Sequence, residues 1–140
     1  MAYVSQDLKA KLAPKIKAIC AKYGVKASLA VRNHSTLVLN IKSGKIDFIE
    51  NFIATDKNKP YAKYMTEDQI AHIRKNRSLD VNPYWYKEHF SGSALKFLSE
   101  LIPAMNNGNH DNSVIQTDYF DVGWYIDVNI GKWNKPYTVE

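Results

Sequence analysis

The 140-residue chain has a single cysteine, Cys20, and therefore cannot form an internal disulfide. A reducing compartment suits such a chain. No apolar run approaches the ~20 residues that a helix needs to cross a bilayer. The N-terminal stretch 1–7 lacks a basic region followed by an apolar core, so we expect no signal peptide. These absences predict a cytoplasmic protein without membrane association.

Motifs for common chemistry are also missing. The six glycines are scattered, and none belongs to a phosphate-binding loop, a nucleophile elbow or a dinucleotide fingerprint. The four histidines lie in four separate segments, and no pair has the i, i+4 spacing of a helical zinc site. Cys20 lies beside the apolar face of a predicted helix, which favours an inert buried thiol over a Cys–His dyad. We therefore predict no catalytic residue, no metal site and no cofactor.

Charge is unevenly distributed along the chain. Residues 1–87 hold 16 Lys and Arg against 7 Asp and Glu, a net charge of +9, whereas residues 88–140 hold 3 against 7, a net charge of −4. A dipolar surface of this kind would suit nucleic acid or a partner of mixed charge. The simpler alternative is that most lysines only keep helices soluble.

The first half of the chain shows clear local signals. Ser5 is a candidate N-cap, and Gly24 a candidate stop, for a helix that Pro14 is expected to kink. Its apolar positions recur at helical spacing: Leu8, Leu12, Ile16, Ile19 and Tyr23. The segments 26–32 and 36–41 then predict a β-hairpin. The apolar segment 46–53 fits either a loose helix or an extended edge.

The second half alternates between irregular and regular segments. Residues 55–91 are mostly irregular, but the capping box from Thr66 to Gln69 predicts a helix through about Arg77. A further helix is expected from Ser91 or Ser93 to about Met105. Strands are predicted over 114–119 and 124–130, joined by a turn.

The last strand has a clear period of two. The alternation places Trp124, Ile126 and Val128 toward the core, and Tyr125, Asp127 and Asn129 toward solvent. The element order is therefore α-β-β, an irregular middle with a helix, then α-β-β. We predict one α+β domain over residues 1–140, with an antiparallel sheet of two β-hairpins and helices on one face.

The irregular middle contains the candidate binding surface. Basic residues can contact phosphates, and aromatic rings can stack on unpaired bases or form protein-binding hot spots. The candidate residues are Arg74, Lys75, Arg77, Tyr84, Trp85, Tyr86 and Lys87. The alternative is that the rings only fold this segment onto the core. Replacing Arg74 and Arg77 by alanine is expected to leave folding nearly intact, because surface substitutions usually change stability little.

An acidic cluster offers a third possibility. Asp111, Asp118, Asp121 and Asp127 lie near His110, and converging oxygens can hold a hard cation. Their spacing matches no EF-hand loop, and Asp111 reads equally well as the start of an Asx turn. A solvated sheet face with turn caps is the competing interpretation.

Several of these residues carry a family resemblance. The C-terminal ones are Asn112–Ser113, Gln116–Val122, Tyr125 and Asn129–Gly131. The N-terminal ones are Ile16–Lys17, Lys22–Lys26 and Val31–Arg32. Together they resemble the large polyvalent protein-associated domain family, found in small proteins of phages, plasmids and related elements. The resemblance implies a biological context and no catalytic residue.

The expected function is therefore that of a non-enzymatic accessory protein of a phage or mobile element. It would bind a host macromolecule, such as a protein complex of CRISPR or restriction defence, and inhibit it. The first alternative is direct nucleic-acid binding through the basic and aromatic residues. The second is a small hydrolase that uses the aspartates, with His110 as acid or base.

Overall fold

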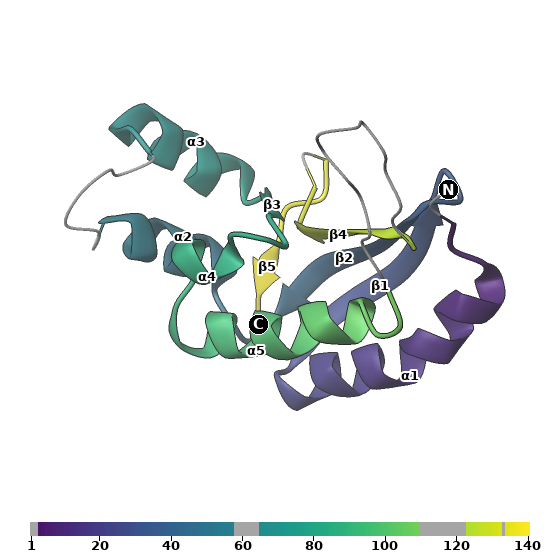
Figure 1. The fold of residues 1–140 in the computed structure, drawn as a ribbon. Coiled ribbons are helices and arrows are strands. Elements are labelled where there is room, and N and C mark those ends of the chain that lie inside the picture. The colour runs from purple at the N-terminus through teal and green to yellow at the C-terminus, as the bar shows by residue number, and fades with distance from the viewer. Residues whose placement is uncertain (1–2, 58–64, 110–122, 133) are drawn as a thin grey trace.

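The computed structural model describes residues 3–57, 65–109, 123–132 and 134–140. It is an α+β structure in which helices pack against a mixed sheet (Figure 1). The helices are α1 (Gln6–Lys22), α2 (Phe48–Lys57), α3 (Glu67–Asn76), α4 (Tyr86–His89) and α5 (Gly92–Met105). The strands are β1 (Val25–Arg32), β2 (Thr36–Gly44), β3 (Leu79–Val81), β4 (Tyr125–Ile130) and β5 (Thr138–Val139).

Local signals account for the N-terminal elements. The Ser5 hydroxyl accepts a hydrogen bond from the amide of Leu8 at 3.0 Å, which caps α1 as predicted. The helix continues through Pro14 as one element. Strands β1 and β2 form the predicted hairpin, and its loop residues Asn33 and His34 adopt positive φ. Asparagine and histidine tolerate this conformation better than most residues.

The sheet corrects the predicted topology. Its strand order is β1-β2-β4-β3, with β5 added to β2. Strand β4 pairs with β2 in parallel and with β3 in antiparallel orientation, so the expectation of an antiparallel sheet of two hairpins is wrong. The segment 114–119, predicted as the partner strand of a second hairpin, lies outside the described residues. Periodicity reveals which face of a strand is buried, but not which strand lies beside it.

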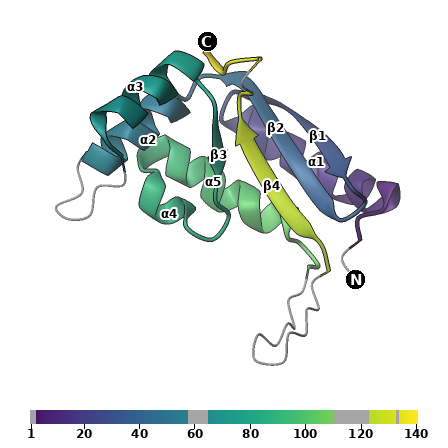
Figure 2. The ribbon, with the colours of Figure 1, turned by 90° about the horizontal axis from the view of Figure 1, so that it is seen from above.

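Helices α1 and α5 cover one face of the sheet, and α1 packs against both β1 and α5 (Figures 1 and 2). Under them, one row of apolar side chains crosses four strands in register: Leu29, Leu39, Val128 and Val81. Helix α5 adds buried Phe97, Leu98 and Leu101 to the same core. This burial supplies most of the free energy that favours folding.

The middle of the chain is more regular than its sequence suggests. The capping box at Thr66 is present, and α3 follows it as predicted. The ambiguous segment 46–53 contributes to α2, and the short strand β3 and helix α4 have no counterpart among the predicted elements. Phe48 at the start of α2 packs against Phe97 and Tyr137, with ring centroids 5.6 Å apart in each pair.

Trp124 confirms the predicted inner face of β4. Its side chain is only 6% exposed, and its indole Nε1 donates to the carbonyl of Met105 at 3.1 Å. The Asn109 side chain donates to the Trp124 carbonyl and accepts from its amide. Through these hydrogen bonds, Trp124 joins the end of α5 to the start of β4. In the described part of the chain, no helix is long and apolar enough to cross a membrane.

Replacing Trp124 by alanine should therefore destabilise the fold by about 3–5 kcal/mol, because a large buried ring and its hydrogen bond are lost. Tyr125→Ala is the matched control: that ring is 47% exposed, and its loss should change stability by about 0.5 kcal/mol or less. Urea unfolding followed by circular dichroism measures both. Equal midpoints for the two variants would contradict the assigned inner face.

Candidate functional site

The most exposed aromatic side chains of the candidate surface lie in the turn between β3 and α4. Tyr84 is 79% exposed and Trp85 is 56% exposed. The Asn82 Oδ1 accepts hydrogen bonds from the amides of both residues, at 2.8 and 3.2 Å. Pro83 restricts the backbone between Asn82 and Tyr84. We call residues 82–85 the aromatic turn; its two rings are held outward by an ordered backbone.

Buried neighbours anchor the aromatic turn on both sides. Val81 precedes it at the end of β3 and is buried, and Tyr86 follows it with only 8% of its surface exposed. Phe90, at the end of α4, packs against Phe48 and Phe52 of α2. Of the three predicted aromatic binding residues, Tyr86 therefore lies in the core, and only Tyr84 and Trp85 face solvent.

Arg74 has an acidic partner. Its guanidinium donates to the Glu50 carboxylate through Nε at 2.9 Å and through Nη2 at 3.1 Å, so the pair is bidentate. This hydrogen bond holds the pKa of Glu50 below its usual range. Arg74 thus links α3 to α2. The Glu50 carboxylate therefore neutralises part of the charge that Arg74 could offer to a phosphate.

Arg77 is also committed to the fold. It ends α3 in the left-handed conformation, and its carbonyl accepts from the Tyr137 amide at 2.8 Å. Its Nε donates to the Tyr137 carbonyl at 3.0 Å, and its Nη2 lies 3.5 Å from Asp47. A Cβ on Gly131 would lie 2.5 Å from the Arg77 carbonyl, so this junction requires glycine. Arg77 therefore fastens the C-terminal segment to α3.

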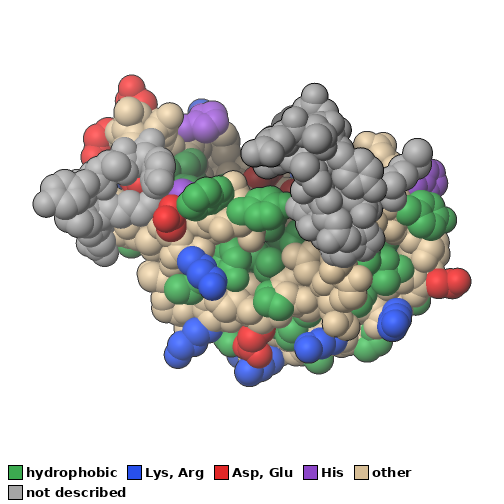
Figure 3. Space-filling view, in the orientation of Figure 1, with side chains coloured by type: hydrophobic (Ala, Val, Ile, Leu, Met, Phe, Trp, Pro, Cys, Tyr) green, Lys and Arg blue, Asp and Glu red, His purple; other side chains and the backbone are tan. Residues whose placement is uncertain are grey.

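The remaining basic residues do not gather around the aromatic turn. Lys75 is exposed on α3 and Lys87 on α4, and neither forms an ion pair within the described residues. Helix α2 lies between α3 and α4 (Figures 1 and 2). On the face shown in Figure 3, Lys and Arg side chains are spread along the edge formed by α5 and α1. Lys87 is therefore the candidate cation nearest in sequence to the two exposed rings.

The acidic cluster falls largely outside the described residues, because His110, Asp111, Asp118 and Asp121 belong to the segment 110–122. Asp127 is described: its carboxylate lies 2.9 Å from the Arg32 guanidinium, and the pair spans β2 from β1 to β4. Where the structure describes the chain, no three His, Cys, Asp or Glu residues are grouped so that they could hold a metal.

Two surface features were not predicted from sequence. A polar row crosses the face of the sheet opposite α1 and α5 and contains Ser28, Asn40, Asn129 and Asp80. Within it, the Asn129 side-chain amide donates to Asn40 Oδ1 at 3.2 Å.

The second feature is a groove between α1 and β1. Ala13 is the residue from which this groove could have been predicted. It is small and lies on the side of α1 that faces the sheet, whereas the apolar residues before and after it on that side are larger.

No family model matches the chain, and no match was found among curated proteins or solved structures.

Arg77→Ala should destabilise the protein by about 1–2 kcal/mol, because a charge-assisted hydrogen bond to the Tyr137 carbonyl is lost. The expectation that alanine at this position leaves folding nearly intact did not include these contacts of Arg77. Lys75→Ala is the control, because Lys75 lies two residues away and no described residue forms an ion pair with it; this variant should unfold like the wild type. Thermal unfolding by calorimetry compares them; no difference would mean that the junction does not contribute to stability.

Cys20 should react slowly. Burial raises the pKa of its thiol to about 11 from an ordinary value of 9.0, so at pH 8 the thiolate fraction falls about a hundredfold. Iodoacetamide should label native protein far more slowly than urea-unfolded protein, as followed by mass spectrometry. The unfolded chain can ionise Cys20 above about pH 9, whereas the folded protein keeps the thiol protonated. The free energy of unfolding should therefore fall as the pH rises above about 9. Equal labelling rates would show that the thiol is accessible.

Proposed function

We propose that the chain is a non-enzymatic binding protein that docks on another protein through the aromatic turn. The observation that carries this proposal is the pair Tyr84 and Trp85, both exposed on a backbone fixed by Asn82. Tyrosine and tryptophan dominate binding hot spots, because they bury a large area and lose little conformational entropy on binding. These two rings contact water in the free protein, so a partner that covers them would remove apolar surface from water and thereby stabilise the complex.

A protein partner is favoured over nucleic acid. Of the three basic binding residues predicted at the end of α3, Arg74 pairs with Glu50, Arg77 holds the C-terminal segment, and only Lys75 is left exposed without an ion pair among the described residues. Nucleic-acid binding draws most of its affinity from several free cations close together. Lys75 on α3 and Lys87 on α4 are separated by α2, and together they supply little of that affinity.

The resemblance to the large polyvalent protein-associated domain family suggests which partner to expect. We extend the proposal to an accessory protein of a phage or mobile element, active in the cytoplasm. Its partner would be a host protein complex, and inhibition of CRISPR or restriction defence is the specific form that we propose. This extension rests on the resemblance, whereas the docking surface rests on the aromatic turn.

Trp85→Ala and Tyr84→Ala should each weaken partner binding by about 2–4 kcal/mol and leave the fold intact, since both rings lie outside the core. Tyr125→Ala removes an exposed ring elsewhere and is the matched control. Tagged variants are compared in pull-downs from a bacterial host lysate, with and without nuclease, by quantitative mass spectrometry. A partner lost only in the turn variants is the expected result.

Two results would contradict the proposal. Recovery that disappears with nuclease would move the function to nucleic-acid binding. A partner retained equally by Trp85→Ala and Tyr125→Ala would show that docking occurs elsewhere on the surface.

A further inference from the structure

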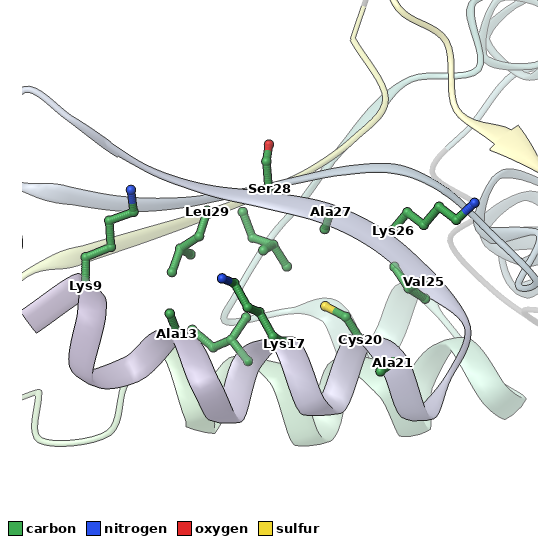
Figure 4. A pocket seen from close by; sticks show the side chains of 12 residues that line it. Lys9, Ala13, Lys17, Cys20, Ala21, Val25, Lys26, Ala27, Ser28 and Leu29 are labelled. Atoms are coloured by element: carbon green, nitrogen blue, oxygen red, sulfur yellow. The ribbon is translucent and has the colours of Figure 1, made fainter.

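A groove of about 550 Å³ runs between α1 and the edge strand β1 (Figure 4). Ile16 and Leu39 provide apolar lining, while Ala13 and Ala27 leave the space open because their side chains are short. Val25 and Cys20 lie near the end of α1 that leads into β1. The groove shares no residue with the aromatic turn.

The strand beside this groove has a free edge. In the order β1-β2-β4-β3, strand β1 ends the sheet, and no other described strand pairs with its outer side. An edge strand presents a row of backbone N–H and C=O groups that can pair with another chain. An extended peptide can therefore add to such an edge and insert alternate side chains into the adjoining groove.

Two lysines of α1 line the helix side of the groove. Lys9 and Lys17 rise from α1 toward β1 (Figure 4), and neither forms an ion pair within the described part of the chain. Lys26 also lines the groove but is paired with Glu140 at 3.0 Å. Two free ammonium groups over an apolar floor complement a peptide that carries both acidic and apolar side chains.

The spacing of the two lysines sets the spacing of the acids. Eight residues along a helix separate Lys9 from Lys17 by about 12 Å. In an extended chain about 13 Å corresponds to four residues, and residues i, i+2 and i+4 point to the same side. A matching peptide therefore places acids at i and i+4 and an apolar residue at i+2.

We propose that this groove binds an extended acidic segment of a partner protein, which adds to β1 as a further strand. The two acids meet Lys9 and Lys17, and the apolar residue between them packs on Ile16 and Leu39. This site is separate from the aromatic turn, and neither proposal depends on the other.

The probe is a fluorescein-labelled nonapeptide with the central sequence Asp-Thr-Val-Thr-Asp, titrated with full-length protein by fluorescence polarisation. Binding should saturate in the micromolar range and weaken as salt rises. Two control peptides separate charge from strand pairing. Lys-Thr-Val-Thr-Lys reverses the charges, and Asp-Thr-Pro-Pro-Asp removes backbone donors in both strand phases. Neither should bind measurably.

Protein variants locate the site. Lys9→Glu with Lys17→Glu should weaken binding by about tenfold or more, because both attractions become repulsions. Lys11→Glu with Lys15→Glu is the control. It changes the net charge of the protein by the same amount, but at exposed positions of α1 that lie outside the groove. It should change affinity by less than about threefold. Ala13→Phe should fill the groove and block binding without any change in charge. Circular dichroism verifies that each variant is folded.

Amide chemical shifts provide an independent readout. In ¹⁵N-labelled protein, the peptide should shift resonances along β1, from Lys26 to Val31, and leave those of Tyr84 and Trp85 unchanged. Absence of binding, equal loss in the two lysine pairs, or shifts confined to the aromatic turn would each overturn the proposal. Concentration-dependent dimerisation without peptide binding would overturn it in favour of a second copy of the chain on β1.

Discussion

The arrangement of the molecule depends on the parallel pairing of β2 with β4. Parallel neighbours cannot be joined by a tight turn, so the chain must cross from the end of one strand back to the start of the other. That crossover spans residues 45–124, which include α2 to α5 and the short strand β3. Because β3 then pairs with the free side of β4, β1 and β3 become the opposite edges of the four-strand path.

The two proposed binding surfaces follow from these edges. Strand β1 has an outer edge beside α1 with which no described strand pairs, and β3 leads directly into the aromatic turn (Figure 2). The surfaces also differ in chemistry: one is a groove with free lysines, and the other presents two rings and little charge. The two arginines of the candidate surface serve the fold instead, since Arg74 holds α2 and Arg77 holds the C-terminal segment. These two arginines therefore give little support to nucleic-acid binding at the candidate surface.

How much the sequence predicts depends on the range of the interaction. The cap at Ser5, the capping box at Thr66 and the inner position of Trp124 follow from neighbouring residues, and the structure confirms them. The parallel partner of β4 could not be predicted, because alternation identifies a buried face and no neighbour. The sequence also does not reveal that Tyr86 is buried while Tyr84 is exposed. The turn at Asn82 and the packing of α4 on α2 determine this difference together.

The most direct test of the central claim is site-specific photocrosslinking in bacterial cells that express the protein. A benzophenone amino acid replaces Tyr84 in one variant and Tyr125 in another, and adducts are identified by mass spectrometry. A binding protein that docks through the aromatic turn predicts a discrete protein adduct from position 84, absent from position 125 and abolished by adding Trp85→Ala. Identical adducts from both positions, or adducts to nucleic acid alone, would contradict the account.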